Sequence, residues 1–122
     1  MKATKAPKKD LDKEMWYLLC SAFEGGSNYW YQIKEYVYPK GKTKADFEYP
    51  YLDLPFKGGA VKITADGERK VYTLDRAALD KGWITFRDDC SRHYADAMNE
   101  TADAVTGDVF LQCCLFGEII FG

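Results

Sequence analysis

The sequence has little of what catalysis or metal binding usually requires. Its 122 residues include one histidine, His93, and no two cysteines are spaced as C-x-x-C. A histidine cluster that binds zinc is therefore excluded. Neither a G-x-G-x-x-G nor a P-loop pattern occurs, so the common signatures of nucleotide-binding α/β enzymes are absent as well.

Long apolar runs are also missing. No segment approaches the roughly 18 apolar residues of a membrane span, and the region after Met1 lacks the apolar core of a secretory signal. We therefore expect a cytoplasmic protein without a membrane partner. In such a reducing compartment, the four cysteines are expected to be free and mostly buried thiols: Cys20, Cys90, Cys113 and Cys114.

Charge is unevenly distributed along the chain. Residues 93–122 contain five acids and no Lys or Arg, whereas residues 1–9 contain four lysines and no acid. We interpret residues 1–9 as a disordered basic tail and residues 10–122 as one domain. The acidic end is either a solvated helix face or a surface that docks on a basic partner. The formal net charge of −2 argues against direct binding of nucleic acid.

Aromatic residues are abundant, at 16% of the chain. Nine Tyr, seven Phe and three Trp exceed what the interior of a small domain needs. We therefore expect some rings to face a groove, a ligand or a partner, where aromatic side chains are enriched.

The first half of the chain predicts a helix, a strand and a long loop. The helix starts at Asp10 or Asp12, either of which is a suitable N-cap, and ends at Gly25-Gly26. Residues 28–38 are rich in aromatic and β-branched residues, which favours a strand. Residues 41–59 hold two prolines and no clear period, which indicates a long surface loop or a strand interrupted by loop, and a loop of that length is often functional.

The second half predicts a hairpin followed by helices. Residues 60–65 and 69–74 flank Asp66-Gly67, a strong hairpin turn signal. A helix capped by Thr73 or Asp75 follows, with apolar spacing that continues to Ala97. The last helix follows the cap signal at residues 106–108 and stops at Gly117.

These elements predict an α+β fold, in which a three-stranded antiparallel sheet packs against about three helices. The chain then ends on Ile119, Ile120 and Phe121. We expect this apolar end to be docked on the core or to form a homo-oligomer interface.

The candidate site is one of binding rather than catalysis. Gly25-Gly26 either ends the helix or offers backbone N–H groups to an anion. The rings after it belong either to the core or to a stacking platform for a base or peptide, and the arginines are either solvated or bound to phosphate. The candidate ligand-binding residues are Gly25, Gly26, Asn28, Tyr29, Trp30, Arg87, Arg92 and His93.

One pair of residues has a spacing that would suit nucleophilic catalysis. Cys90 and His93 lie three residues apart on a predicted helix, so their side chains can meet. Nothing in the sequence orients the imidazole or supplies an oxyanion hole. We therefore expect no enzyme activity, no catalytic residue, no metal and no cofactor.

Two blocks of the sequence resemble a known group of proteins. Residues 23–30 read FEGGSNYW, a G-G-x-x-Y-W block, and residues 107–122 read GDVFLQCCLFGEIIFG, with an L-F-G-E ending. Together they are similar to small accessory proteins encoded by phages and prophages. The resemblance covers most of the chain, and it brings no catalytic residues with it.

This resemblance implies a role against host defence. Our leading hypothesis is that the protein sequesters a nucleotide-type immune signal without turnover. One alternative is an anti-CRISPR-like inhibitor that binds a host defence protein directly, through its acidic C-terminal third or through residues 40–58. Another is a small enzyme that acts on a nucleotide.

Overall fold

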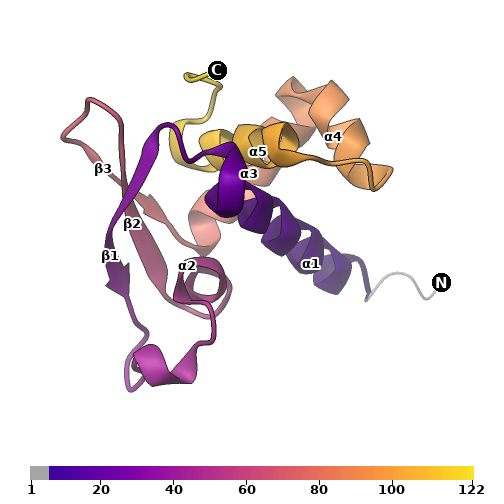
Figure 1. Cartoon of the computed structure of the whole chain (residues 1–122). Helices are drawn as coiled ribbons and strands as arrows, with labels where there is room; N and C mark the ends of the chain where they lie inside the picture. Colours follow the sequence, from indigo (N-terminus) through magenta and orange to yellow (C-terminus); the bar gives the residue numbers. More distant parts are fainter. Residues whose placement is uncertain (1–5) are drawn as a thin grey trace.

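The structure, a computed structural model, describes residues 6–122, with side chains from residue 11 onward. Three strands form one layer of the molecule and the long helices form another (Figure 1). The predicted α+β fold with a three-stranded antiparallel sheet is confirmed. None of the described helices combines the length and apolar character needed to cross a bilayer.

The sheet has the order β1-β2-β3, with β1 Tyr31–Val37, β2 Ala60–Ala65 and β3 Val71–Leu74. Both pairings are antiparallel, as predicted from the hairpin signal. At the turn, Gly67 adopts φ +78°, a left-handed conformation that favours glycine. Every residue of β2 except Lys62 is buried, and Val61 and Ile63 are fully so, which makes β2 the central strand of the core.

The first strand begins later than predicted. Residues 27–30 form a turn rather than strand, because the Trp30 N–H donates to the Ser27 carbonyl at 3.0 Å. The sheet starts only at Tyr31, which pairs with Ala65. Asn28, Tyr29 and Trp30 therefore sit at the end of the sheet and not within it.

The helix before this turn is longer than predicted. α1 spans Ala6–Ser21, so it begins before Asp10, and it continues into a π-helical turn, η2, at Ala22–Gly26. Residues 1–5 of the predicted tail lie outside the described residues, while residues 6–9 belong to α1. Gly25 and Gly26 do end the helical segment, although neither adopts the left-handed conformation.

The next helical stretch is divided in two. Asp75 caps α3, Arg76–Asp89, by accepting the Ala78 N–H at 2.9 Å, which matches one of the two predicted caps. The helix breaks at Cys90, whose φ of −126° and ψ of 51° are not helical, and α4 follows at Ser91–Met98. The apolar spacing in the sequence continues across Cys90, so the spacing did not predict the break.

The last helix, α5, spans Ala104–Phe116 and starts earlier than predicted. Its cap is Asp103, which exchanges hydrogen bonds with Thr106, so Asp108 lies inside the helix. Gly117 ends it at φ +75°, as predicted. Residues 106–114 are all buried, which makes α5 the central helix of the domain.

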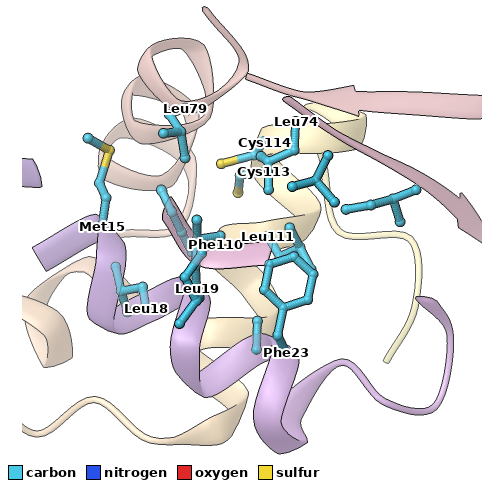
Figure 2. Packing of buried hydrophobic residues seen from close by; sticks show 14 of the residues in the cluster. Met15, Leu18, Leu19, Phe23, Leu74, Leu79, Phe110, Leu111, Cys113 and Cys114 are labelled. Carbon is cyan, nitrogen blue, oxygen red and sulfur yellow. The ribbon is translucent and has the colours of Figure 1, made fainter. Parts of the chain in front are cut away.

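The core forms where α5 meets α1 and α3. Figure 2 shows Leu18 and Leu19 of α1 beside Phe110 and Leu111 of α5, with Leu79 of α3 near Cys114. Glycines allow the close approach: a Cβ at Gly82 would collide with the Cys114 sulfur, and one at Gly107 with the Leu18 carbonyl oxygen. We predicted that Gly82 marks either a break or a close helix contact, and the structure shows the close contact.

Residues 41–59 are organised and not an open loop. They contain η3 at Lys44–Asp46, α2 at Pro50–Asp53 and η4 at Leu54–Phe56. The segment also buries side chains, as a surface loop would not. Its buried residues are Phe47, Leu52, Leu54, Pro55 and Gly59.

Candidate functional site

The two sequence blocks of the resemblance meet at one buried carboxylate. Asp108 of α5 is 6% exposed. Its Oδ1 accepts hydrogen bonds from the Ser27 hydroxyl at 2.7 Å, the Trp30 indole N–H at 2.7 Å and the Gln112 amide at 3.2 Å. Its Oδ2 accepts one from the Tyr29 hydroxyl at 2.7 Å. We refer to Ser27, Tyr29, Trp30, Asp108 and Gln112 as the Asp108 cluster.

Gln112 connects the cluster to the end of the chain. Its Oε1 accepts the backbone N–H groups of Ile120 at 2.8 Å and Phe121 at 2.9 Å, and its Nε2 donates to the Phe121 carbonyl at 3.1 Å. The predicted docking of the C-terminus is thus present through Phe121. Ile119 and Ile120, however, remain about half exposed.

Trp30 is a core residue in this arrangement. The side chain is 2% exposed, and the Phe121 ring stacks on it with centroids 5.3 Å apart and planes 6° apart. Phe116 packs at another side, also at 5.3 Å. Of the two alternatives for this ring, the structure therefore gives the core one, and no exposed stacking face is left on Trp30.

Tyr29, its neighbour, is the opposite case. The residue is 55% exposed, yet its hydroxyl is fixed to Asp108. Burial of that hydroxyl, and then the bond to Asp108, raise the pKa of Tyr29 to about 12. The phenol therefore stays neutral and keeps donating at ordinary pH, which holds an exposed ring in one orientation.

Tyr29 stands at the wall of a polar cleft of about 410 Å³. One wall comes from the turn and the start of β1, including Asn28 and Gln32. The other comes from the end of β2 and the hairpin turn, residues 64–69. Antiparallel pairing explains this arrangement, because the Asp66 N–H donates to the Trp30 carbonyl at 2.7 Å and so brings the hairpin turn beside residues 28–30.

The second wall carries charges of both signs. Asp66, Glu68 and Arg69 are all exposed there, and Glu68 accepts a hydrogen bond from Tyr72 at 2.9 Å. Carboxylates suit the hydroxyl groups of a sugar, and a guanidinium suits a phosphate. Our sequence analysis did not select these residues. The Asp66-Gly67 turn signal, combined with the antiparallel order, was the signal that could have identified them.

The predicted site residues separate into two groups. Asn28, Tyr29 and Trp30 all line the cleft, although the Trp30 side chain is almost fully buried. Gly25 and Gly26 lie at the end of η2 on a different surface: Gly25 lines a hollow with Tyr17 and Cys20, and a Cβ at Gly26 would collide with the Ala104 carbonyl oxygen. Close packing therefore accounts for Gly26.

Arg87, Arg92 and His93 do not line the cleft. In Figure 1 the α4 helix, which carries Arg92 and His93, lies beyond α5 from the strands. The Arg87 Nε donates to Asp88 at 2.7 Å, so this arginine pairs with its own neighbour. His93 is half-buried, and its Nδ1 finds no hydrogen-bond partner among the described residues.

Among residues 11–122, no hydrogen bond joins Cys90 to His93, and the Cys90 sulfur lies 3.8 Å from the sulfur of Cys113. Within residues 11–122, no three His, Cys, Asp or Glu side chains gather as a metal site would need.

Most of the aromatic excess is absorbed by packing. Rings form contacts through the whole interior, among them Trp83 with Phe86 and Phe110. The exposed aromatic residues are three tyrosines: Tyr17, Tyr29 and Tyr49. Fewer rings are therefore exposed than the composition led us to expect. Of these three tyrosines, Tyr29 faces the polar cleft.

Comparison with known proteins gives no match. No protein-family model fits the chain, and neither a curated protein nor a solved structure resembles it.

Proposed function

We propose that this protein acts in the cytoplasm of a phage-infected host, where it binds a nucleotide-type immune signal in the cleft beside Tyr29 and does not transform it. The proposal is supported mainly by one observation: the exposed ring of Tyr29 is held in one orientation by a hydrogen bond to a buried carboxylate. The Tyr29 ring is open to solvent, and the Asp108 carboxylate fixes its hydroxyl at 2.7 Å. A ring that is already oriented loses little freedom when a base stacks on it.

The rest of the cleft offers complementary groups for such a ligand. The amides of Asn28 and Gln32 can donate and accept on one wall. Glu68 and Asp66 suit ribose hydroxyls, and Arg69 suits a phosphate. A volume of about 410 Å³ accommodates a nucleotide-sized molecule.

A thermal-shift experiment tests the proposal. Purified protein is incubated with a panel of cyclic nucleotides and ADP-ribose, and the midpoint of unfolding is measured. We expect one member to raise the Tm by several degrees and to be recovered intact after denaturation. Recovery of a chemically changed ligand would instead identify an enzyme, and the absence of any shift counts against the signal class.

Tyr17 provides a matched control for Tyr29. The two residues are 54% and 55% exposed, but Tyr17 lies on α1 and does not line the cleft. We expect Tyr29→Ala to lower the affinity about tenfold, since stacking of one base contributes about 1–3 kcal/mol. Tyr17→Ala should leave the affinity unchanged, and an equal loss in both variants would refute the site.

A second candidate function rests on a separate surface. Trp16, Tyr17 and Phe56 line an apolar hollow of about 330 Å³ between α1 and the 50–57 segment, and Tyr49 packs edge-on to Trp16. Exposed Trp and Tyr are frequent anchors of protein interfaces. This surface supports the alternative of an inhibitor that binds a host defence protein, and there Tyr17→Ala should abolish binding while Tyr29→Ala does not.

A further inference from the structure

Two of the four cysteines lie against each other in the folded chain. The sulfurs of Cys90 and Cys113 are 3.8 Å apart, although the residues are separated by 23 positions in sequence. Cys113 belongs to α5 and is 2% exposed. Cys90 is half-buried and sits at the junction of α3 and α4, so this residue, unlike Cys113, keeps some exposure to solvent.

The remaining two thiols occupy different surroundings. Cys114 is buried in the contact with Gly82, where a Cβ on the glycine would meet its sulfur. Cys20 lies on α1 and lines a hollow with Tyr17 and Glu24. A bridge between the adjacent Cys113 and Cys114 would need a strained eight-membered ring, so Cys90 is the favoured partner of Cys113.

The local backbone allows the sulfurs to close the gap. A disulfide bond is about 2.05 Å long, so the sulfurs must approach by about 1.8 Å. Cys90 has non-helical torsions at a break between two helices, and rotation of its χ1 angle moves the sulfur by more than an ångström.

We propose that Cys90 and Cys113 are an oxidative modification site, at which hydrogen peroxide converts the two thiols into a reversible intramolecular disulfide. The proposal does not depend on the ligand-binding function. It would tie the α3–α4 junction covalently to α5, the helix that carries Asp108.

The chemistry proceeds in two balanced steps. The Cys90 thiolate attacks one peroxide oxygen, the O–O bond breaks, and Cys90 becomes a sulfenic acid while a water molecule forms. The Cys113 sulfur then attacks the Cys90 sulfur, the S–O bond breaks, and the hydroxyl leaves as a second water with the Cys113 proton. Two thiols are oxidised and one hydrogen peroxide molecule is reduced.

The order of the two steps follows from burial. Burial, and next to it the neighbouring Cys90, raise the pKa of the Cys113 thiol, so this sulfur is a poor first nucleophile. The half-buried Cys90 therefore meets the oxidant first. Cys113 is held beside it as the resolving thiol.

Peptide mapping tests the site in the wild-type protein. The reduced full-length chain is treated with hydrogen peroxide, free thiols are alkylated, and the protein is digested with trypsin. Cleavage after Arg87 and Arg92 frees Cys90 in the peptide 88–92, while Cys113 and Cys114 stay together because no Lys or Arg follows Arg92. Fragmentation between residues 113 and 114 then locates the alkyl group.

We expect peptide 88–92 to be linked to the C-terminal fragment, with the alkyl group on Cys114 and complete reversal by dithiothreitol. Cys90→Ser should abolish the link and Cys20→Ser should not. Oxidation should also raise the Tm of the wild type by about 5 °C or more, because the bridge restricts the unfolded chain, with no rise in Cys90→Ser. A link to Cys20 or Cys114, or a sulfinic acid at Cys90 without any link, would overturn the proposal.

Discussion

The turn at residues 27–30 contributes to two regions that differ in almost every physical respect. Trp30 points inward and joins Asp108, Gln112 and Phe121 in a buried polar and aromatic centre. Tyr29 reaches the same carboxylate through its hydroxyl but leaves its ring in the solvent. The buried region stabilises the fold, and the exposed region is positioned by it.

One carboxylate serves both regions. Asp108 uses Oδ1 for the inner donors and Oδ2 for Tyr29. Removing it should therefore strongly destabilise the fold, while changing Tyr29 should affect binding far more than stability.

The largest effect is expected for Asp108→Ala. The substitution leaves the donors of Ser27, Trp30 and Gln112 without their acceptor in the interior, and we expect a loss of about 4 kcal/mol in the free energy of unfolding. Urea denaturation measures it. Asp53→Ala is the matched control, because Asp53 accepts the Trp16 indole N–H at a part-buried site and should cost about 1 kcal/mol. Equal losses in both variants would contradict the central role of Asp108.

A smaller loss is expected when the stacked ring of the C-terminus is removed. Phe121→Ala takes away the face-to-face partner of Trp30, and we expect about 2 kcal/mol of destabilisation and a red shift of tryptophan fluorescence as Trp30 meets water. Ile120→Ala, at a half-exposed neighbour, should cost about 0.5 kcal/mol or less and leave the spectrum unchanged. An unshifted spectrum in Phe121→Ala would show that Trp30 is covered by something else.

Tyr29→Phe separates the contribution of the ring from that of the hydroxyl group. The variant keeps the ring but loses the hydrogen bond to Asp108, so we expect stability to fall by only about 1 kcal/mol. Ligand affinity should fall about threefold, less than the tenfold expected for Tyr29→Ala. Calorimetric titration measures the ligand affinities of the two variants. Affinity equal to that of Tyr29→Ala would mean that the hydroxyl, and not the ring, makes the contact.

Alkaline pH gives the smallest effect. The pKa of Tyr29 is raised to about 12, above the ordinary value of about 10, because burial and the bond to Asp108 disfavour the phenolate. Stabilisation by this hydroxyl is therefore complete below about pH 10 and is lost as the pH rises through about 12. Other tyrosines titrate in the same range, so the difference between wild type and Tyr29→Phe is the quantity to follow. Parallel stability curves would contradict the assignment.

Local signals in the sequence were sufficient for the order of the sheet and for several helix ends. Asp66-Gly67 identified the hairpin, Asp75 the start of α3 and Gly117 the end of α5, because each acts through its own backbone neighbours. The break at Cys90 and the helical turns in residues 41–59 were missed, since tertiary packing and not local periodicity determines them.

The site was only partly predictable for the same reason. Tyr29 and Asn28 were selected from composition and do face the cleft, but nothing local distinguishes the exposed Tyr29 from the buried Trp30. That distinction depends on Asp108, which lies 78 and 79 positions away along the chain. Arg87 and Arg92 were selected for their charge alone, and charge does not report distance from a cleft.

The proposed function requires that a ligand contact the chain at the Tyr29 cleft. A titration of isotope-labelled protein with ADP-ribose, and with cyclic nucleotides, followed by two-dimensional ¹H–¹⁵N NMR, locates that contact residue by residue. We expect the amide signals of residues 28–32 and 64–69 to move together while those of residues 87–93 stay in place. Shifts confined to residues 87–93, or no shifts with any ligand of the panel, would contradict the assignment of the Tyr29 cleft.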